Sequence, residues 1–374
     1  MLHAADASIK LGNTAPYSGP ASAYGTIASA AAAYFQMLND RGGINGHKIE
    51  LISLDDTYSS PKTVEQTRRL VEQDDVLAVF SSVGTAPNIA VQKYLNLKKV
   101  PQLFVSTGAS RWNDHEHFPW TVGFNPTYEL EGRVYAQYIL KTKPDAKIAM
   151  IIPNEDAGKD YLRGFKDGLG DHISQLVSQT TYLTTDPTID SQIVTMQQSG
   201  ADVFFAEATP KFAAMALKKA ASIGWKPLII LPAVSNSVSA VLEPAGRENS
   251  IGVVTGLYLK DPNDKAWADD PALKDFLAWM KKYQPNANTG DLLRLHPRQC
   301  HQASHQPQEY HPADATARHH HPQRSRQLHS DSPTEDGKVR RQSVGAVRRR
   351  DRRIARPSRS GVVPISRSEY PAVL

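Results

Sequence analysis

The first fifty residues alternate between short apolar stretches and one long amphipathic stretch. Ile9–Asn13 and Lys48–Leu54 have the apolar, β-branched character of sheet strands, and Thr26–Asp40 repeats its apolar positions with the period of an α-helix. The pattern predicts a strand, a helix and a second strand. Such a unit implies parallel strands with a right-handed crossover, and ligands of these sheets bind beyond the carboxyl ends of the strands.

The same alternation continues to residue 290 in two series. The first predicts helices and strands at Pro61–Gln73, Val76–Phe80, Asn88–Leu97 and Gln102–Val105. The second predicts them at Tyr128–Thr142, Lys147–Ile152, Gly158–Leu169, Gln175–Leu183, Ser191–Gln198, Ala201–Ala206, Pro210–Ile223 and Leu228–Leu231. We therefore expect an α/β protein with two open parallel-sheet lobes joined near Gly123–Pro126. Because a further helix at Pro271–Tyr283 is expected to cross back, lobe 1 is assigned 8–123 plus 256–290, and lobe 2 is assigned 124–255.

Three loops after strands of the first series share one chemistry. Pro16–Gly19, Ser81–Thr85 and Ser106–Ser110 are rich in small residues and hydroxyls. Each alone could be an ordinary loop between a strand and a helix. Three such loops at one sheet edge would converge on one crevice, which favours a small-molecule site.

Charge is distributed unevenly along the 374 residues. The net charge of +5 would suggest an acidic partner, but residues 1–290 carry 27 Lys and Arg against 30 Asp and Glu. The positive excess lies wholly in residues 291–374, so no nucleic-acid partner is expected for the body. The one cysteine, Cys300, lies in the same tail, which leaves the body without a disulfide or a thiolate metal site.

Signatures of enzymes are absent from the sequence. We find no glycine-rich dinucleotide or phosphate loop, no nucleophile elbow and no zinc-protease motif. Asp55-Asp56 could form a carboxylate dyad or a metal site, but more often such a pair is a solvated cap at a strand end. Glu155-Asp156 could contact a ligand, although a helix cap is the favoured role. His115 and His117 are too few for a metal site. No catalytic residue, metal or cofactor is therefore expected.

Several segments resemble the periplasmic leucine/isoleucine/valine-type substrate-binding proteins of ABC transporters. They are Asn13–Pro20, Asn39–Gly46, Leu54–Asp56, Val100–Phe104, Gly158–Tyr161 and Ser199–Val203, and the resemblance covers residues 8–290 in order. It implies a type I periplasmic-binding-protein fold with a hinge, a ligand cleft and no chemistry on the ligand. It also implies a monomer that works in the periplasm with a membrane permease. The N-terminus lacks the charged and apolar regions of a signal peptide, which is expected either of a mature end left after cleavage, the alternative that the resemblance favours, or of a cytosolic start.

The resemblance also implies where a ligand carboxylate would be held. The matching first-lobe positions are Ser82, Gly84, Thr85, Gly108, Ala109 and Ser110, and the first-strand loop adds Tyr17 and Ser18. In the second lobe this chain has Ala157, Ala208 and Ala233 where amino-acid binders of the family place an aromatic residue, a tyrosine and a glutamate that pairs the ligand ammonium. Glu207 could restore that acid from a neighbouring position.

These departures favour a carboxylate ligand without an ammonium group. An unpaired buried ammonium is unfavourable, and the lost aromatic side chains widen the pocket. An aromatic acid would use that space, with Tyr17, Tyr24, Trp112 and Tyr161 as candidates to pack on its ring. Branched-chain amino acids remain the competing ligands, and a ligand-sensing regulatory domain or a two-domain α/β enzyme are the other classes of protein.

The αβ pattern stops after Asp291. The tail could bind nucleic acid through Arg348–Arg350 or metal through His319–His321. A frameshift near codon 291 is the sharper hypothesis, because shifted codons of Gly337–Ile354 permit AKFDGKAWVRFGDVIAG and a stop, and those of Leu292–His296 permit SFAYT. Both resemble C-terminal segments of the same family. We expect such a tail to lack stable structure and the first lobe to be incomplete.

Overall fold

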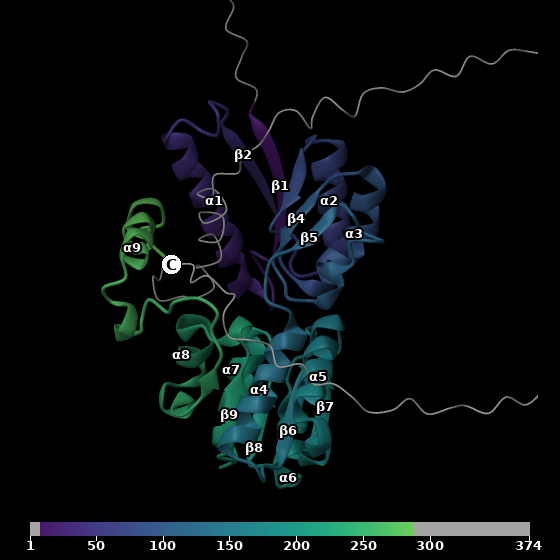
Figure 1. Ribbon diagram of the computed structural model, residues 1–374, viewed down its shortest axis with the longest axis vertical. Helices are drawn as coiled ribbons and strands as arrows, with labels where there is room; N and C mark the ends of the chain where they lie inside the picture. Colours follow the sequence, from purple (N-terminus) through teal and green to yellow (C-terminus); the bar gives the residue numbers. More distant parts are fainter. Residues whose placement is uncertain (1–7, 288–374) are drawn as a thin grey trace, which may run out of the picture. The chain divides into compact units, whose positions relative to one another are not determined.

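The first lobe is built on a parallel sheet of five strands. A computed structural model describes residues 8–287, with the strand order β2-β1-β3-β4-β5 in this sheet (Figure 1). The strands are β1 (Ile9–Ala15), β2 (Ile49–Asp55), β3 (Ala78–Phe80), β4 (Gln102–Val105) and β5 (Thr121–Gly123). Helices α1 (Gly25–Asp40), α2 (Ser60–Glu72) and α3 (Thr85–Lys98) connect them.

The second lobe repeats this plan with the strand order β10-β9-β8-β6-β7. Its strands are β6 (Ile148–Pro153), β7 (Leu176–Tyr182), β8 (Val203–Ala206), β9 (Leu228–Leu231) and β10 (Val254–Thr255). Its helices are α4 (Tyr128–Thr142), α5 (Asp156–Leu169), α6 (Asp190–Gln198), α7 (Pro210–Ser222) and the short α8 (Glu243–Ala245). All pairings within both sheets are parallel, as the alternation of helices and strands predicts.

Strand β8 shows why the second sheet is stable. Phe204 packs with the helices α6 and α7 on one face, and Phe205 packs with α4 and α5 on the other. Both rings are fully buried, as expected for a parallel sheet covered on two faces. Helices α4 and α5 approach so closely that a Cβ built on Gly164 would lie 1.9 Å from the carbonyl oxygen of Glu129.

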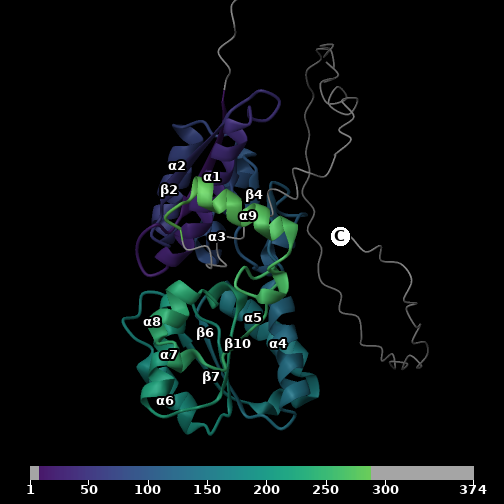
Figure 2. The same ribbon diagram turned by 90° about the vertical axis from the view of Figure 1, so that its left-hand side faces the viewer.

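The last helix of the described chain, α9 (Pro271–Tyr283), packs against α1 of the first lobe (Figure 2). Trp279 and Tyr283 contact the apolar cluster that contains Tyr34 and Phe35. Strand β10, which precedes this crossing, pairs with β9 of the second sheet. The chain therefore passes from the second lobe to the first after Thr255, where the sequence pattern places the boundary, although the exact domain limits stay a prediction.

A few elements differ from the sequence prediction. Helix α3 begins at Thr85, not Asn88, because Gly84 supplies a positive φ of 100° at the N-cap and Pro87 lies in the first turn, where no backbone N–H is needed. Strand β5, with three residues, and the short helical turns between 233 and 250 were not predicted, because they are too short to show a period. The predicted tail 291–374 lies outside the described residues. No helix within residues 8–287 has the length and apolar character to cross a membrane.

Candidate functional site

A pocket lies where the carboxyl ends of strands from both lobes meet. The first-lobe side lies after strands β1 to β4 and extends to the segment between β5 and α4, where the chain first passes to the second lobe. It is lined by Tyr24, Ile27, Tyr58, Val83, Gly84, Thr85, Ser106, Asn125 and Tyr128. The second-lobe side follows β6, β8 and β9 and is lined by Pro153, Glu155, Ala157, Glu207, Thr209 and Val234. We call this the interlobe pocket. Its place is the one that parallel sheets favour for ligands.

The first-lobe wall offers hydrogen-bond donors. The 14-residue helix α3 starts at Thr85, and its first N–H groups have no acceptor within the helix. The Asn88 amide donates to the carbonyl oxygens of Ser82 (2.9 Å) and Gly84 (2.8 Å), which fixes the loop in front of the helix. The Thr107 hydroxyl contacts that of Thr85 and donates to the Tyr128 hydroxyl at 3.1 Å. This wall suits the oxygen atoms of a carboxylate.

The second-lobe wall is acidic. Glu207 follows β8, is only 4% exposed, and its Oε2 atom has no hydrogen-bond partner among the described residues. Burial raises the pKa of Glu207 well above its usual value, and the carboxyls of Glu155 and Glu131 raise it further. Burial also raises the pKa of Glu155 to about 7, although a hydrogen bond from the Tyr58 hydroxyl (3.3 Å) lowers it in part. No lysine, arginine or histidine of residues 8–287 lines the pocket.

A third acid, the half-buried Glu131, lies behind this wall and is fully engaged. Its carboxylate accepts hydrogen bonds from the hydroxyls of Tyr135 and Tyr161, both at 2.6 Å, and from the backbone N–H of Ala233 at 2.7 Å. Burial raises the pKa of Glu131, while these three donors lower it. Glu131 thereby ties the loop after β9 to helices α4 and α5.

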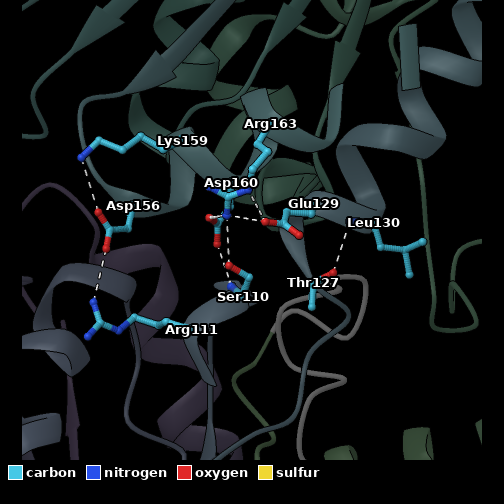
Figure 3. A network of polar contacts seen from close by, with 9 residues as sticks. All are labelled: Ser110, Arg111, Thr127, Glu129, Leu130, Asp156, Lys159, Asp160 and Arg163. Atoms are coloured by element: carbon cyan, nitrogen blue, oxygen red, sulfur yellow. Dashed lines mark hydrogen bonds and ion pairs between the residues drawn. The ribbon is translucent and has the colours of Figure 1, made fainter. Parts of the chain in front are cut away.

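Polar contacts join the two lobes beside the pocket (Figure 3). The backbone N–H of Ser110, in the loop after β4, donates to Asp160 Oδ2 of helix α5 at 2.7 Å. Arg163 pairs with Asp160 and with Glu129, and it donates to the Ser110 hydroxyl at 3.2 Å. Arg111 of the first lobe lies 3.4 Å from Asp156 of the second. A mostly buried carboxylate, Asp160, thus anchors this network.

Four of the residues predicted to bind ligand line the pocket, namely Gly84, Thr85, Ala157 and Glu207. The other ten lie elsewhere. Tyr17 and Ser18 bond to Ser53 and Asp55. Ser82 accepts a hydrogen bond from the Thr14 N–H, and Gly108 packs on Tyr128. Ala109 and Trp112 lie in a core cluster with Val105, and Ala208 in the second-lobe core. Tyr161 stacks on Tyr128, Ala233 bonds to Glu131 and Ser110 to Asp160.

Other pocket residues were missed or given another role. Glu155 stands at the N-cap of α5, but its side chain makes no capping hydrogen bond and faces the pocket, so the capping role assigned to it was wrong. Tyr58 and Tyr128 were not predicted to line the site. Each follows closely after the end of a strand, β2 or β5, and this position in the sequence could have identified them. Tyr24, one of the aromatic candidates, lines the pocket with its ring 6.5 Å from that of Tyr58.

The remaining chemical candidates have structural roles. Asp55 accepts hydrogen bonds from the backbone N–H groups of Tyr17 and Thr57, and Asp56 accepts them from Tyr58 N–H and the Thr63 hydroxyl, so the pair organises turns. Among residues 8–287 no group of three or more metal-ligating side chains could hold a metal ion.

Two parallel-sheet lobes with a pocket at their strand ends define a two-lobed substrate-binding protein. The model of the periplasmic binding protein family matches residues 8–294, and the chain belongs to this family. The family and the fold are those of substrate-binding proteins rather than of enzymes.

Individual relatives place the chain within this family. Leu/Ile/Val-binding protein homolog 7 of Brucella suis biovar 1 is 24% identical over 301 residues, which cover 77% of this chain and 74% of the relative. A possible leucine/isoleucine/valine-binding protein from Rhodopirellula baltica has a TM-score of 0.70 at 21% identity, covering 79% of this chain and 80% of that one. A fatty acid ABC transporter substrate-binding protein from Thermomonospora curvata has a TM-score of 0.65 at 23% identity, covering 75% and 71%. The fold is therefore the type I periplasmic-binding-protein fold.

Proposed function

We propose that this protein binds a small carboxylate in the interlobe pocket, outside the cytoplasmic membrane, and delivers it to the permease of an ABC importer. The observation that supports a carboxylate ligand is the set of hydrogen-bond donors on the first-lobe wall, where helix α3 begins at Thr85 and Thr85 lines the pocket. Donors of this kind hold a carboxylate without an arginine, because charge-assisted hydrogen bonds are strong in a closed, dry cleft. The importer is inferred from membership of the family, and we expect the protein to act as a monomer.

Aromatic acids are one ligand class that fits this wall. Ala157 leaves space in the pocket where a larger residue would fill it, and the rings of Tyr24, Tyr58 and Tyr128 line the same space. Apolar and aromatic walls with a few polar groups are typical of sites for ring-containing ligands. Benzoate and cinnamate derivatives would satisfy the donor wall and stack on these rings.

Amino acids are the second class, and Glu207 favours them. Its unpartnered Oε2 atom is buried on the wall that faces the carboxylate donors. The names of the relatives from Brucella suis and Rhodopirellula baltica also point to leucine, isoleucine and valine. An α-amino acid would present its carboxylate to one wall and its ammonium to the other.

A thermal-shift panel on the full-length chain tests the proposal with leucine, phenylalanine, 4-hydroxybenzoate and p-coumarate. A ligand at about 100 times its Kd adds about 2.7 kcal/mol to the folded state. For a protein of this size that corresponds to about 5–10 °C in Tm. A shift with at least one acid supports the proposal, and the pattern of shifts separates the two ligand classes. If none of the four acids changes the Tm, the carboxylate proposal is refuted.

A further inference from the structure

A second hollow lies between the lobes, beside the interlobe pocket. It has a volume of about 520 Å3 and is here called the outer hollow. The loop after β1 lines it with Pro20, Ser22 and Ala23, and helix α7 lines it with Pro210, Lys211 and Lys218. The sequence neighbours of Ala23 and Pro210, which are Tyr24 and Thr209, line the interlobe pocket. The two spaces therefore adjoin on both lobes.

The outer hollow lies away from the two segments where the chain crosses between the lobes. The first crossing leads into α4 at Tyr128, and the second leaves β10 at Gly256, whose backbone N–H donates to the Tyr135 hydroxyl of α4 at 3.0 Å. Helix α4 covers one face of the second sheet, and α7 covers the other. Lobes that open about the crossings separate most on the side of α7, so a ligand reaches the interlobe pocket through the outer hollow.

Two positive charges line the outer hollow, and no carboxylate of residues 8–287 lines it. Lys211 and Lys218 are exposed, and within the described chain neither forms an ion pair with a carboxylate. The ammonium nitrogen of Lys211 lies 5.2 Å from the centre of the Phe212 ring, which leaves its charge in place. Lys219 of the same helix is instead paired with Asp190 at 2.9 Å. The positive charge at the outer hollow is therefore free to act on a ligand.

We infer that Lys211 and Lys218 form an encounter site that captures the ligand at the entrance of the cleft, and that the ligand carries a net negative charge. This inference rests on the proposed function and selects the acids without an amine from its two ligand classes. Residues 1–290 carry 30 Asp and Glu against 27 Lys and Arg, so the field of the body as a whole repels an anion. Two unpaired lysines beside the path reverse that field where the ligand enters.

A zwitterion gains little from this encounter site, because the lysines repel its ammonium group while they attract its carboxylate. The acid deeper in the cleft does not oppose an anion, since burial raises the pKa of Glu207 and thereby favours its neutral form. The nearest acid of α8, Glu243, is paired with Arg247 and adds no net charge at the entrance. The charges around the path therefore favour the entry of a monoanion over that of an amino acid.

Stopped-flow fluorescence on the full-length chain tests the encounter site with 4-hydroxybenzoate and p-coumarate, and with leucine and phenylalanine as zwitterions. Two lysines at about 8 Å in water raise the local concentration of a monoanion roughly fivefold, and salt screens this gain. We expect the association rate constant of at least one of the two anions to fall about fivefold between about 20 mM and 0.5 M NaCl. The dissociation rate constant should change less than about twofold, because charges outside the binding pocket act mainly on association.

Variants locate the effect. At low salt K211Q/K218Q should lower the association rate constant of the anion about fivefold, and at high salt it should match the unmodified protein. The control is K226Q, because Lys226 is an exposed lysine that follows α7 and does not line the outer hollow. K226Q should change the association rate constant less than about twofold.

Each other outcome has a definite meaning. An association rate constant that does not depend on salt, or that K211Q/K218Q leaves unchanged, overturns the inference. An equal loss in K226Q also overturns it, because the attraction would then belong to the whole protein. Binding of leucine or phenylalanine alone overturns the inference and leaves the proposed function standing, whereas no binding by any of the four acids refutes the proposed function itself.

Discussion

Asp160 offers a test of how the two lobes are held together. Its side chain is only 7% exposed, and it accepts a hydrogen bond from the Ser110 N–H of the first lobe while pairing with Arg163 on its own helix. In D160N the amide can turn its oxygen toward Ser110 or toward Arg163, but its NH2 group then faces a donor at the other partner. One of the two contacts must therefore be lost (Figure 3).

The size of the effect follows from the charge and the burial. Hydrogen bonds to charged groups contribute about 1.5–3 kcal/mol, and Asp160 loses its charge as well as one partner. We expect D160N to lower the free energy of unfolding by about 1.5–3 kcal/mol. At 2–4 °C per kcal/mol this is a fall of about 3–12 °C in Tm. Ligand affinity should change less than about threefold, because neither Asp160 nor Ser110 lines the interlobe pocket.

Thermal unfolding and calorimetric titration of the same variant separate these effects. D167N is the control, since Asp167 forms an exposed ion pair with Arg133 at 3.1 Å within the second lobe. Surface pairs of this kind contribute about 0.2–1 kcal/mol, so D167N should change the Tm little. A D160N protein with the Tm of the control and a 10-fold weaker affinity would refute the reasoning, because the contact would then form only when the lobes close on ligand.

Two further predictions concern buried acids. The folded pKa of Glu155, about 7, exceeds its ordinary value of 4.5, so between these values the folded state binds a proton that the unfolded state lacks. The free energy of unfolding of the ligand-free protein should thus fall by about 3 kcal/mol as pH rises from about 4.5 to 7. A plot of Tm against pH should be flatter for E155Q than for the unmodified protein. A steeper plot for E155Q would contradict the prediction. Y161F removes a 2.6 Å hydrogen bond to the half-buried Glu131 and should lower the free energy of unfolding by about 1–3 kcal/mol in urea unfolding; an unchanged midpoint would contradict that role.

The lobes could be read from the sequence because each strand is followed by a helix with a clear period. Phe204 and Phe205 illustrate this, since a strand buried on both faces needs apolar residues at consecutive positions. The crossing of α9 to the first lobe was also predictable, because Pro271–Tyr283 follows a completed second series. Strand β5 and the turns after Ala233 were not, because their conformation depends on neighbours in space rather than on a repeating local pattern.

The site was only partly predictable for a different reason. The sequence analysis chose loops after strands, and Gly84, Thr85 and Glu207 from those loops line the pocket. Their role in ligand binding stays a prediction. The position of a residue in the sequence did not predict whether its side chain points into the pocket or into the core of a lobe. Trp112 and Tyr161 lie in the right segments, yet both rings are buried in the lobes, where apolar contacts stabilise them as well as a ligand would. Glu155 was assigned to capping from its place before a helix, a place that does not determine which way the side chain points.

The end of the recognisable sequence agrees with the frameshift hypothesis. The family match stops at residue 294, three positions after the codon where the αβ pattern fails. Restoring the frame should therefore extend the match without altering the residues that line the pocket, since all of them precede residue 235. Sequencing of the coding DNA across codon 291 decides this, and an intact frame would disprove the frameshift.

Three acids of the second lobe, Glu207 (buried) and Glu131 and Glu155 (half-buried), differ in how many hydrogen-bond donors the protein gives them, and this difference indicates their roles. Glu131 has three close donors, Glu155 has one long one, and the Oε2 atom of Glu207 has none among the described residues. Because donors offset the cost of burying a carboxylate, an acid with a full set needs no ligand to be stable. Glu131 therefore acts as a scaffold for the loop after β9. Glu207 has no donor at its Oε2 atom among the described residues, so its cost of burial is not offset there and it has no comparable scaffold role.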